Sequence, residues 1–337
     1  MPARVKAFVC GCEGWAFTYD ELRFIAAEQP WGLILFKRNV ESPAQLRALT
    51  ARFRDVVGRA DAPVLVDQEG GRVQRLGPPH WPAYPAAAVY GQAAGEAARD
   101  AAALGGTLMA HDLRDAGITV DCAPVLDVPA PGSHQVVGNR GFGPDPDSVA
   151  RLGRAFAEGL MRGGVLPVIK HVPGHGRAVV DSHLELPVVT ATRAELDAID
   201  FAPFRALADL PAAMTAHVVY TAIDPAFPAT TSRIVHRTII RGALGFDGLL
   251  ISDDLSMEAL KGTLGERAEA AATAGCDILL HCNGKLDEAR QVAAVARPLD
   301  GAAARRVADA MARMSRATPG PVASDRDRFA ALMAANA

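Results

Sequence analysis

Eight short apolar runs that alternate with longer stretches of helical periodicity predict an α/β protein, built as a single (β/α)8 TIM barrel. The length of 337 residues is within the range of one such barrel. No Ser-, Gly- or Pro-rich linker separates two halves of different composition. We therefore expect one domain over residues 1–337, with a short helical tail from about residue 318.

The expected strands are short and apolar, which is typical of strands that are buried on both faces of a parallel sheet. They cover residues 5–9, 32–36, 63–67, 118–123, 165–170, 212–217, 248–252 and 277–281. Helix-start signals lie between them, namely Thr18 or Asp20, Ser42 before Pro43, and Thr192 three residues before Glu195. Residues 77–85 and 129–132 are rich in Pro and Gly and predict loops.

The composition excludes several classes of protein. Half of the residues are apolar and the net charge is only −3, so the chain can bury a large core and has no electrostatic reason to bind nucleic acid. No run approaches the roughly 18 apolar residues of a membrane span, and the N-terminal apolar run is too short for a signal peptide. The five cysteines suit reduced thiols better than disulfides or a structural zinc site. We expect a cytoplasmic monomer without a membrane partner.

Charged residues gather at the carboxyl ends of the expected strands, where the active sites of (β/α)8 barrels are built. These residues are Asp67, Lys170, His171, His217, Asp253 and Asp254. Because side chains alternate along a strand, Asp253 and Asp254 should point in different directions. Asp254 can then cap a helix over the following LSMEAL while Asp253 faces the barrel mouth.

Three further polar residues at strand ends allow a structural interpretation. Asp121 and Asp127 follow the fourth expected strand, and we expect them to brace loops rather than act on a substrate. For His217, a hydrogen-bonded structural role and a substrate contact are equally consistent with the sequence.

The segment KHVPGHGRAVVDSH, residues 170–183, contains three histidines and an aspartate. His171, His175, Asp181 and His183 could be metal ligands, but Pro173 and its neighbouring glycines disfavour a helix that presents two ligands on one face. The segment also lacks the phosphate-binding GxxxxGK[ST] pattern and the GxSxG pattern of serine hydrolases.

Proton transfer is the chemistry that this segment favours. Asp181 and His183 are two residues apart and can pair in an extended loop, where the carboxylate would fix the imidazole tautomer and favour its protonated form. Such a histidine could protonate a leaving group near neutral pH and take a proton back from water.

Six segments in this order and spacing together resemble the single-domain bacterial β-N-acetylglucosaminidases of glycoside hydrolase family 3. They are ILFKRN (34–39), VDQEGGRVQRL (66–76), DCAPVLDV (121–128), GNRGFG (138–143), KHVPGHGRAVVDSHLELP (170–187) and ISDDLSM (251–257). The resemblance implies an exo-acting enzyme that removes terminal β-linked N-acetylglucosamine from peptidoglycan fragments (muropeptides) in cell-wall recycling. It also implies a retaining two-step mechanism without cofactor or metal. Asn139 and Gly141 depart from the family pattern, which bears on fine substrate preference.

The resemblance also assigns roles to individual residues. Asp253 would be the nucleophile, His183 the general acid/base and Asp181 its partner. The residues that would hold the sugar are Asp67, Arg75, Arg140, Lys170 and His171. His175 would shape the loop rather than take part in catalysis.

Three alternative functions stay open at this point. A histidine acid/base places less negative charge beside an incoming phosphate, so a phosphorylase acting on the same β-N-acetylglucosaminides could use this site. A metal-dependent amidohydrolase on the same barrel is a hypothesis from a different class. A non-catalytic sugar-binding protein is the third, although it would have no use for Asp181, His183 and Asp253 together.

Overall fold

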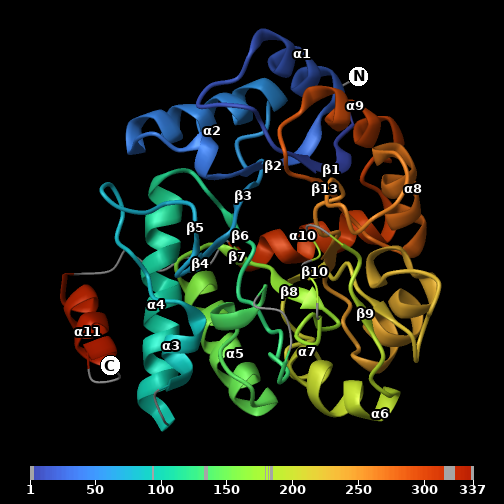
Figure 1. The fold of residues 1–337 in the computed structure, drawn as a ribbon. Coiled ribbons are helices and arrows are strands. Elements are labelled where there is room, and N and C mark those ends of the chain that lie inside the picture. Colours follow the sequence, from blue (N-terminus) through green and yellow to red (C-terminus); the bar gives the residue numbers. More distant parts are fainter. Residues whose placement is uncertain are drawn as a thin grey trace.

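A computed structural model describes residues 4–92, 95–132, 136–178, 180, 182, 185–314 and 323–334 of the chain. Within these ranges, eight parallel strand segments form a ring that is surrounded by helices (Figure 1). They are β1 Lys6–Cys10, β2 Pro30–Leu35, β3 Val64–Val66, β6 Val120–Asp121, β7 Leu166–Pro167 continued by β8 Ile169–Val172, β10 Ala212–Thr215, β12 Leu249–Ile251 and β13 Leu279–His281. Each overlaps one of the expected strands, so the predicted α/β architecture is confirmed.

The strands follow one another around the ring in chain order. One sheet has the order β13-β1-β2-β3-β6-β7 and the other has the order β12-β10-β8. Two isolated parallel bridges join their edges, one between Val125 and Lys170 and one between Ile251 and Ile278. The ladder is interrupted near Pro124 and Pro167, because proline has no N–H to donate to a neighbouring strand.

Helices and short irregular segments connect the strands. The α-helices are α1 Tyr19–Glu28, α2 Pro43–Val57, α3 Ala87–Gln92, α4 Gly95–Asp115, α5 Pro146–Arg162, α6 Arg193–Glu195, α7 Ala202–Ala206, α8 Leu264–Ala274, α9 Leu286–Val295, α10 Gly301–Met314 and α11 Ala323–Ala334. The other helical segments are the 3₁₀ turns η1 Lys37–Asn39, η2 Gly138–Arg140 and η4 Ala229–Thr231, and the π-helices η3 Leu196–Asp200 and η5 Val235–Ala243. Two small strand pairs complete the fold, β4 Gln68–Gly70 with β5 Val73–Gln74 and β9 Val188–Val189 with β11 Val219–Tyr220.

The predicted helix starts are confirmed, and the structure decides between the two candidates for the first helix. Thr18, not Asp20, caps α1: its hydroxyl accepts from the backbone N–H of Glu21 at 3.2 Å, and the Glu21 carboxylate accepts from the backbone N–H of Thr18 at 2.7 Å. Ser42 caps α2, and Thr192 caps α6 with the same capping box. The stretches predicted as loops, 77–85 and 129–132, contain neither helix nor strand.

The core has two layers, because alternate strand residues face opposite sides. Phe8 of β1 packs outward among the helices, and its neighbour Val9 packs inside the barrel with residues such as Ile34 and Leu65. Apolar side chains therefore fill the barrel interior, and α10 packs over the amino ends of the strands through Ala310. This filling leaves the carboxyl ends of the strands as the place for a site.

The C-terminal helix α11 lies against α4 at the edge of the molecule (Figure 1). Phe329 packs with its ring centroid 6.3 Å from those of Tyr84 and Tyr90. Arg326 forms an ion pair with Asp112 at 2.7 Å. The expected start of the tail, about residue 318, lies outside the described residues, and α11 is the last helix of the described part of the chain.

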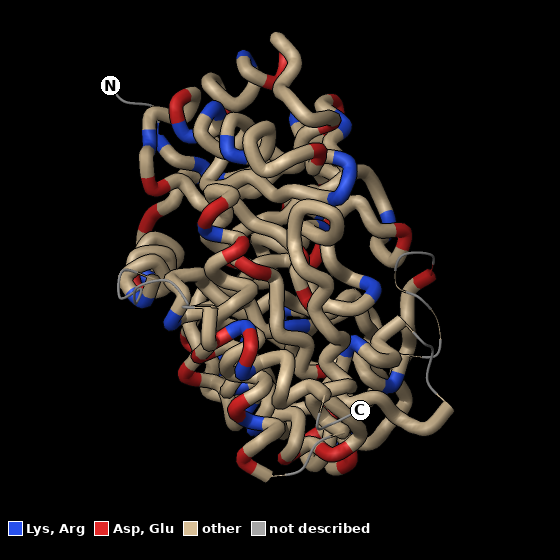
Figure 2. Tube along the Cα trace, turned by 90° about the vertical axis from the view of Figure 1, so that its left-hand side faces the viewer, with Lys and Arg blue, Asp and Glu red and all other residues tan. Residues whose placement is uncertain are grey.

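The distribution of charged residues and the state of the cysteines are consistent with the amino-acid composition. Acidic and basic residues are interspersed along the trace (Figure 2). All five cysteines lie in the described ranges, where they are buried free thiols. No helix in the described part of the chain has both the length and the apolar character that a membrane crossing requires.

Candidate active site

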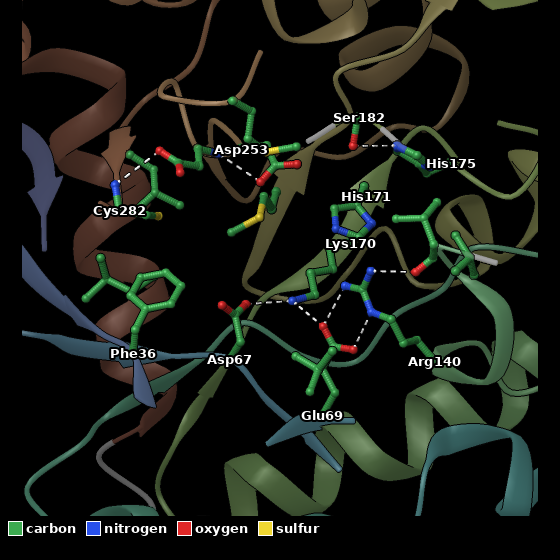
Figure 3. Close-up of a pocket in the computed structure, with 18 of the residues that line it drawn as sticks. Phe36, Asp67, Glu69, Arg140, Lys170, His171, His175, Ser182, Asp253 and Cys282 are labelled. Carbon is green, nitrogen blue, oxygen red and sulfur yellow. Dashed lines mark hydrogen bonds and ion pairs between the residues drawn. The ribbon is translucent and has the colours of Figure 1, made fainter. Parts of the chain in front are cut away.

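A cavity of about 280 Å³ opens at the carboxyl ends of the strands (Figure 3). Its volume is at the small end of the range for ligand sites, so it suits one small ligand rather than a long polymer. The described residues that line it are Ile34, Phe36, Asp67, Glu69, Val73, Arg75, Val136, Val137, Arg140, Lys170, His171, His175, Ser182, Met214, Asp253, Asp254, Met257, Leu280 and Cys282. Segments far apart in the sequence, from β2 to β13, therefore meet at one place.

A buried ion network forms one wall of the cavity, with Lys170 at its centre (Figure 3). The Lys170 Nζ donates to Asp67 Oδ1 at 2.8 Å and lies 2.7 Å from Glu69 Oε1. Arg75 Nη2 donates to the other oxygen of Asp67 at 3.2 Å. Arg140 binds Glu69 through two parallel hydrogen bonds of 2.7 Å each. The Lys170 side chain is only 2% exposed, so this contact set is shielded from water.

The charges in this network hold one another ionised. Burial alone would raise the pKa of Asp67, but Lys170 and Arg75 hold it well below its usual range. Burial opposes ionisation of Glu69 as well, yet Arg140 and Lys170 lower its pKa to about 2. In return, although burial lowers the pKa values of Lys170 and Arg140, the carboxylates raise both above their ordinary values. The network therefore offers fixed charges that do not titrate near neutral pH.

Asp127 organises two histidines, His171 at the end of β8 and His175 in the loop that follows it. Its Oδ2 lies 2.7 Å from His171 Nδ1, and its Oδ1 accepts from the backbone N–H groups of His171 at 3.1 Å and His175 at 2.7 Å. Burial favours a higher Asp127 pKa, but His171 and these hydrogen bonds lower it to about 2. The carboxylate thus engages Nδ1 of His171 and leaves Nε2 for a ligand. Asp127 braces the loop, as the sequence predicts.

Asp121 has a bracing role too, beneath the ion network. It is fully buried, and its Oδ1 accepts from the backbone N–H of Gln68 at 2.9 Å. Burial raises its pKa well above the usual range for an aspartate. This contact holds the start of β4, the segment that carries Glu69.

His175 lies next to His171, with 5.6 Å between the ring centroids. Its Nε2 is 3.1 Å from Ser182 Oγ. Burial, followed by the nearby His171, lowers the pKa of His175 to about 4, so this imidazole is neutral at pH 7. The geometry fits the predicted loop-shaping role, because His175 ties Ser182 to the loop that follows β8.

Asp253 and Asp254 follow β12, and their carboxylates accept hydrogen bonds from different partners. Asp253 Oδ1 accepts from the backbone N–H of Asp254 at 2.8 Å. Asp254 Oδ1 accepts from the backbone N–H of Cys282 at 3.1 Å, and its Oδ2 accepts from the Ser256 hydroxyl at 2.6 Å. Asp254 therefore ties the turn after β12 to the end of β13.

The helix expected directly after Asp254 does not form. Residues 255–260, all of them described, are turns, and α8 begins only at Leu264 behind the cap Thr263. Arg267 Nη1 donates to the carbonyl oxygens of Leu255 and Met257 at 3.0 Å each. These contacts satisfy backbone acceptors that a helix would have satisfied internally, and the Asp254 side chain is engaged with Cys282.

Of the two roles that the sequence allows for His217, a structural role and a substrate contact, the structure shows the structural one. It is fully buried and is not among the described residues that line the cavity. Its Nδ1 lies 2.7 Å from Thr230 Oγ1, and its Nε2 lies 2.9 Å from the carbonyl oxygen of Asp254. Both ring nitrogens are thus occupied by protein atoms.

Comparison with known proteins relates this site to a family of enzymes. The model of the glycosyl hydrolase family 3 N-terminal domain matches residues 12–317. The chain belongs to glycosyl hydrolase family 3. Proteins named beta-hexosaminidase match it from Alkalilimnicola ehrlichii, at 44% identity over 280 residues, and from Methylococcus capsulatus, at 45% identity over 268 residues. These matches cover 81% and 78% of this chain, and 79% of each relative.

Two solved structures have the same fold. NagZ from Neisseria gonorrhoeae in complex with N-trifluoroacetyl-D-glucosamine superimposes with a TM-score of 0.87 and 34% identity, covering 98% of both chains. A β-N-acetylhexosaminidase from Beutenbergia cavernae superimposes with a TM-score of 0.76 and 29% identity, covering 98% of this chain and 96% of that one. The chain is a glycoside hydrolase of the β-hexosaminidase group, and its (β/α)8 fold is confirmed.

The structure brings most of the predicted family 3 site residues together. Asp253 and the five predicted sugar ligands all line the cavity, although Arg140 commits three of its five N–H groups to Glu69 and the carbonyl oxygen of Val136. Asp181 and His183 lie outside the described residues, while Ser182 between them is buried and lines the cavity. In the described part of the chain, no three His, Cys, Asp or Glu side chains are grouped as metal ligands would be.

Glu69 is the important cavity residue that the sequence analysis missed. It lies two residues after Asp67 and so faces the same side of an extended segment, which is a signal in the sequence. Its partner Arg140 is 71 positions away, and the sequence alone gives no indication that the two side chains meet.

Proposed function

We propose that this family 3 hydrolase is an exo-β-N-acetylglucosaminidase that acts on muropeptides, in the cytoplasm, during cell-wall recycling. Two comparisons support the choice of sugar: the curated relatives are named beta-hexosaminidase, and the NagZ relative was solved with an N-acylated glucosamine. The cavity of about 280 Å³ supports exo action, because it suits one terminal sugar rather than an extended glycan.

The proposed reaction has two steps and retains the anomeric configuration. In the first step, an Asp253 carboxylate oxygen bonds to the anomeric carbon, and the bond from that carbon to the leaving oxygen breaks as His183 protonates the leaving group. In the second step, water attacks the same carbon, gives its proton to His183 and releases the Asp253 carboxylate. Asp181 would pair with His183 and stabilise its charged form.

The position of Asp253 supports its part in this mechanism. It lies two residues after the end of β12 and lines the cavity, and a backbone N–H holds one of its carboxylate oxygens at 2.8 Å. For Asp181 and His183 the support is the family resemblance, together with the position of Ser182, which lies between them in sequence and lines the cavity.

The ion network supplies the proposed contacts to the sugar. Lys170 has three N–H groups, of which two point to Asp67 and Glu69, so one is left for a sugar hydroxyl. The Asp67 carboxylate accepts one hydrogen bond on each oxygen and has further lone pairs to accept from hydroxyls. Because these groups are held ionised, they can orient a polar ligand without changing protonation.

The observation that carries this proposal is that Asp253 shares one cavity with the ion network. Asp253→Asn keeps the size of the side chain and removes the nucleophile, and we expect it to lower kcat on an aryl β-N-acetylglucosaminide by several orders of magnitude. The matched control is Asp287→Asn, because the Asp287 side chain is 90% exposed on α9. Activity of Asp253→Asn near that of the control would remove Asp253 from this role.

A further inference from the structure

A series of four hydrogen bonds links β10 to the two aspartates after β12. The backbone N–H of Asp253 donates to Thr215 Oγ1 at 3.2 Å, and Thr215 Oγ1 lies 2.8 Å from Thr230 Oγ1. The series continues from Thr230 Oγ1 to His217 Nδ1 at 2.7 Å, and from His217 Nε2 to the carbonyl oxygen of Asp254 at 2.9 Å. It therefore begins on one residue of the pair and ends on the next.

The two ends of this series fix its direction. A carbonyl oxygen only accepts, so His217 Nε2 must donate to Asp254. In the neutral imidazole, Nδ1 then accepts from the Thr230 hydroxyl at 2.7 Å, and the carbonyl oxygen of Ala216, at 3.0 Å, is a second acceptor for the same hydroxyl. Thr215 can donate its own hydroxyl hydrogen to Thr230, because it accepts from the Asp253 N–H. Each donor then has an acceptor, and every hydrogen bond in the series is donated in the direction from Asp253 to Asp254.

These hydrogen bonds hold the segment that carries Asp253 and do not reach the ligand cavity. Thr215, Thr230 and His217 are each fully buried, and none of the three is among the described residues that line the cavity. Between the two clamped ends lies the Asp253–Asp254 peptide, whose N–H donates to Asp253 Oδ1 at 2.8 Å. The orientation of this peptide therefore determines where one oxygen of the Asp253 carboxylate is held.

We propose that Thr215, Thr230 and His217 are positioning residues that hold the Asp253 carboxylate in line with the anomeric carbon. The proposal rests on the proposed role of Asp253 as nucleophile. Loss of the Thr215 hydroxyl leaves the Asp253 N–H without its acceptor and frees the peptide to rotate. A misplacement of the order of 1 Å at a reacting atom can lower the rate about 100-fold. Sugar binding should change little, because Lys170 is in β8 and Asp67 lies between β3 and β4.

The test compares Thr215→Val, which removes the hydroxyl at nearly constant shape, with Thr215→Ser, which keeps it. The control is Thr238→Val, because the Thr238 hydroxyl also forms a hydrogen bond with the backbone, donating to the carbonyl oxygen of Ile234, but is exposed. On an aryl β-N-acetylglucosaminide, we expect Thr215→Val to lower kcat about 10- to 100-fold and to change KM less than about threefold. Thr215→Ser should recover most of kcat, and the control should match the wild type.

A double variant separates positioning from a general loss of stability. If Thr215 and Thr230 act through one series of hydrogen bonds, Thr215→Val with Thr230→Val should lower kcat little more than either substitution alone. Multiplied effects of the two substitutions would overturn the proposal. It would also be overturned if Thr215→Val kept kcat within about twofold, raised KM instead, or lost activity only in proportion to the folded fraction measured by circular dichroism. If Thr215→Val does not fold, Thr230→Val and Thr215→Ser carry the same comparison.

The outcome for Asp253 itself distinguishes this proposal from the proposed function. An inactive Asp253→Asn beside a fully active Thr215→Val would refute the positioning role alone. An active Asp253→Asn would refute the assignment of the nucleophile on which the positioning role depends.

Discussion

Lys170→Met should destabilise the protein in a way that depends on pH. The substitution keeps an unbranched side chain but removes the cation that lies between Asp67 and Glu69. The fall of the Glu69 pKa from its ordinary 4.5 to about 2 corresponds to about 3 kcal/mol of stability at pH 7, since one pKa unit is about 1.4 kcal/mol. Lys170 and Arg140 together lower the pKa of Glu69. Removal of the Lys170 ammonium also leaves Arg75 as the cation that pairs with Asp67. Breaking a buried ion pair by removing one partner costs about 3–5 kcal/mol, and we expect a loss in this range at pH 7.

The sign of the pH dependence follows from the carboxylates. In the wild type their lowered pKa values contribute stability that is complete above the unfolded-state values near 4 and is lost only as the pH falls below them. Without Lys170, burial raises the pKa values of Asp67 and Glu69, so the folded variant gains stability relative to the wild type as the pH falls. Arg140 and Arg75 stay beside the carboxylates, and the titration lies near and below the unfolded-state pKa values, so the difference in unfolding free energy between variant and wild type should shrink between pH 7 and pH 3.

Urea unfolding at both pH values measures this difference. The matched control is Lys285→Met, because the Lys285 side chain is 70% exposed and its ion pair with Glu288 is on the surface. We expect the control to change stability by less than about 0.5 kcal/mol at either pH. A loss below about 1 kcal/mol for Lys170→Met, or an equal loss at both pH values, would refute the reasoning.

Two further predictions concern the scaffold. Burial lowers the pKa of His236 to about 4, so the wild type should lose stability as the pH falls below 6.5, and His236→Met should lose about 2 kcal/mol less between pH 7 and pH 5 in urea unfolding. Parallel pH curves for the two proteins would contradict this effect of His236. Thr18→Ala removes the cap of α1 and should cost about 1 kcal/mol in thermal unfolding, more than Asp20→Ala, which removes only a charge in the first turn. Equal losses would show that the Thr18 hydroxyl does not cap the helix.

The sequence predicts the barrel well because its strands need only local signals. Val64–Val66 and Leu249–Ile251 are fully buried, and an uninterrupted apolar run is what such a strand requires. The side chains at the strand ends could also be predicted, since the barrel topology alone brings Asp67, Lys170 and Asp253 to one mouth.

The features that the sequence does not predict depend on side-chain contacts between residues far apart in the sequence. Glu69 is significant because Arg140 and Lys170 reach it, and neither contact is encoded near Glu69. The helix expected after Asp254 is replaced by turns because Asp254 binds the backbone of Cys282 and Arg267 satisfies two carbonyl oxygens of the turn. In both cases a long-range side-chain contact decides the outcome.

The central claim, that Asp253 attacks the anomeric carbon, is tested most directly by trapping the glycosyl-enzyme. A fluorinated N-acetylglucosaminide whose second step is slow would be incubated with the enzyme, and the labelled peptide would be sequenced by mass spectrometry. We predict one added sugar on Asp253, which fragmentation distinguishes from its neighbour Asp254. A label on Asp254 or on any other residue, or turnover without any covalent adduct, would contradict the account.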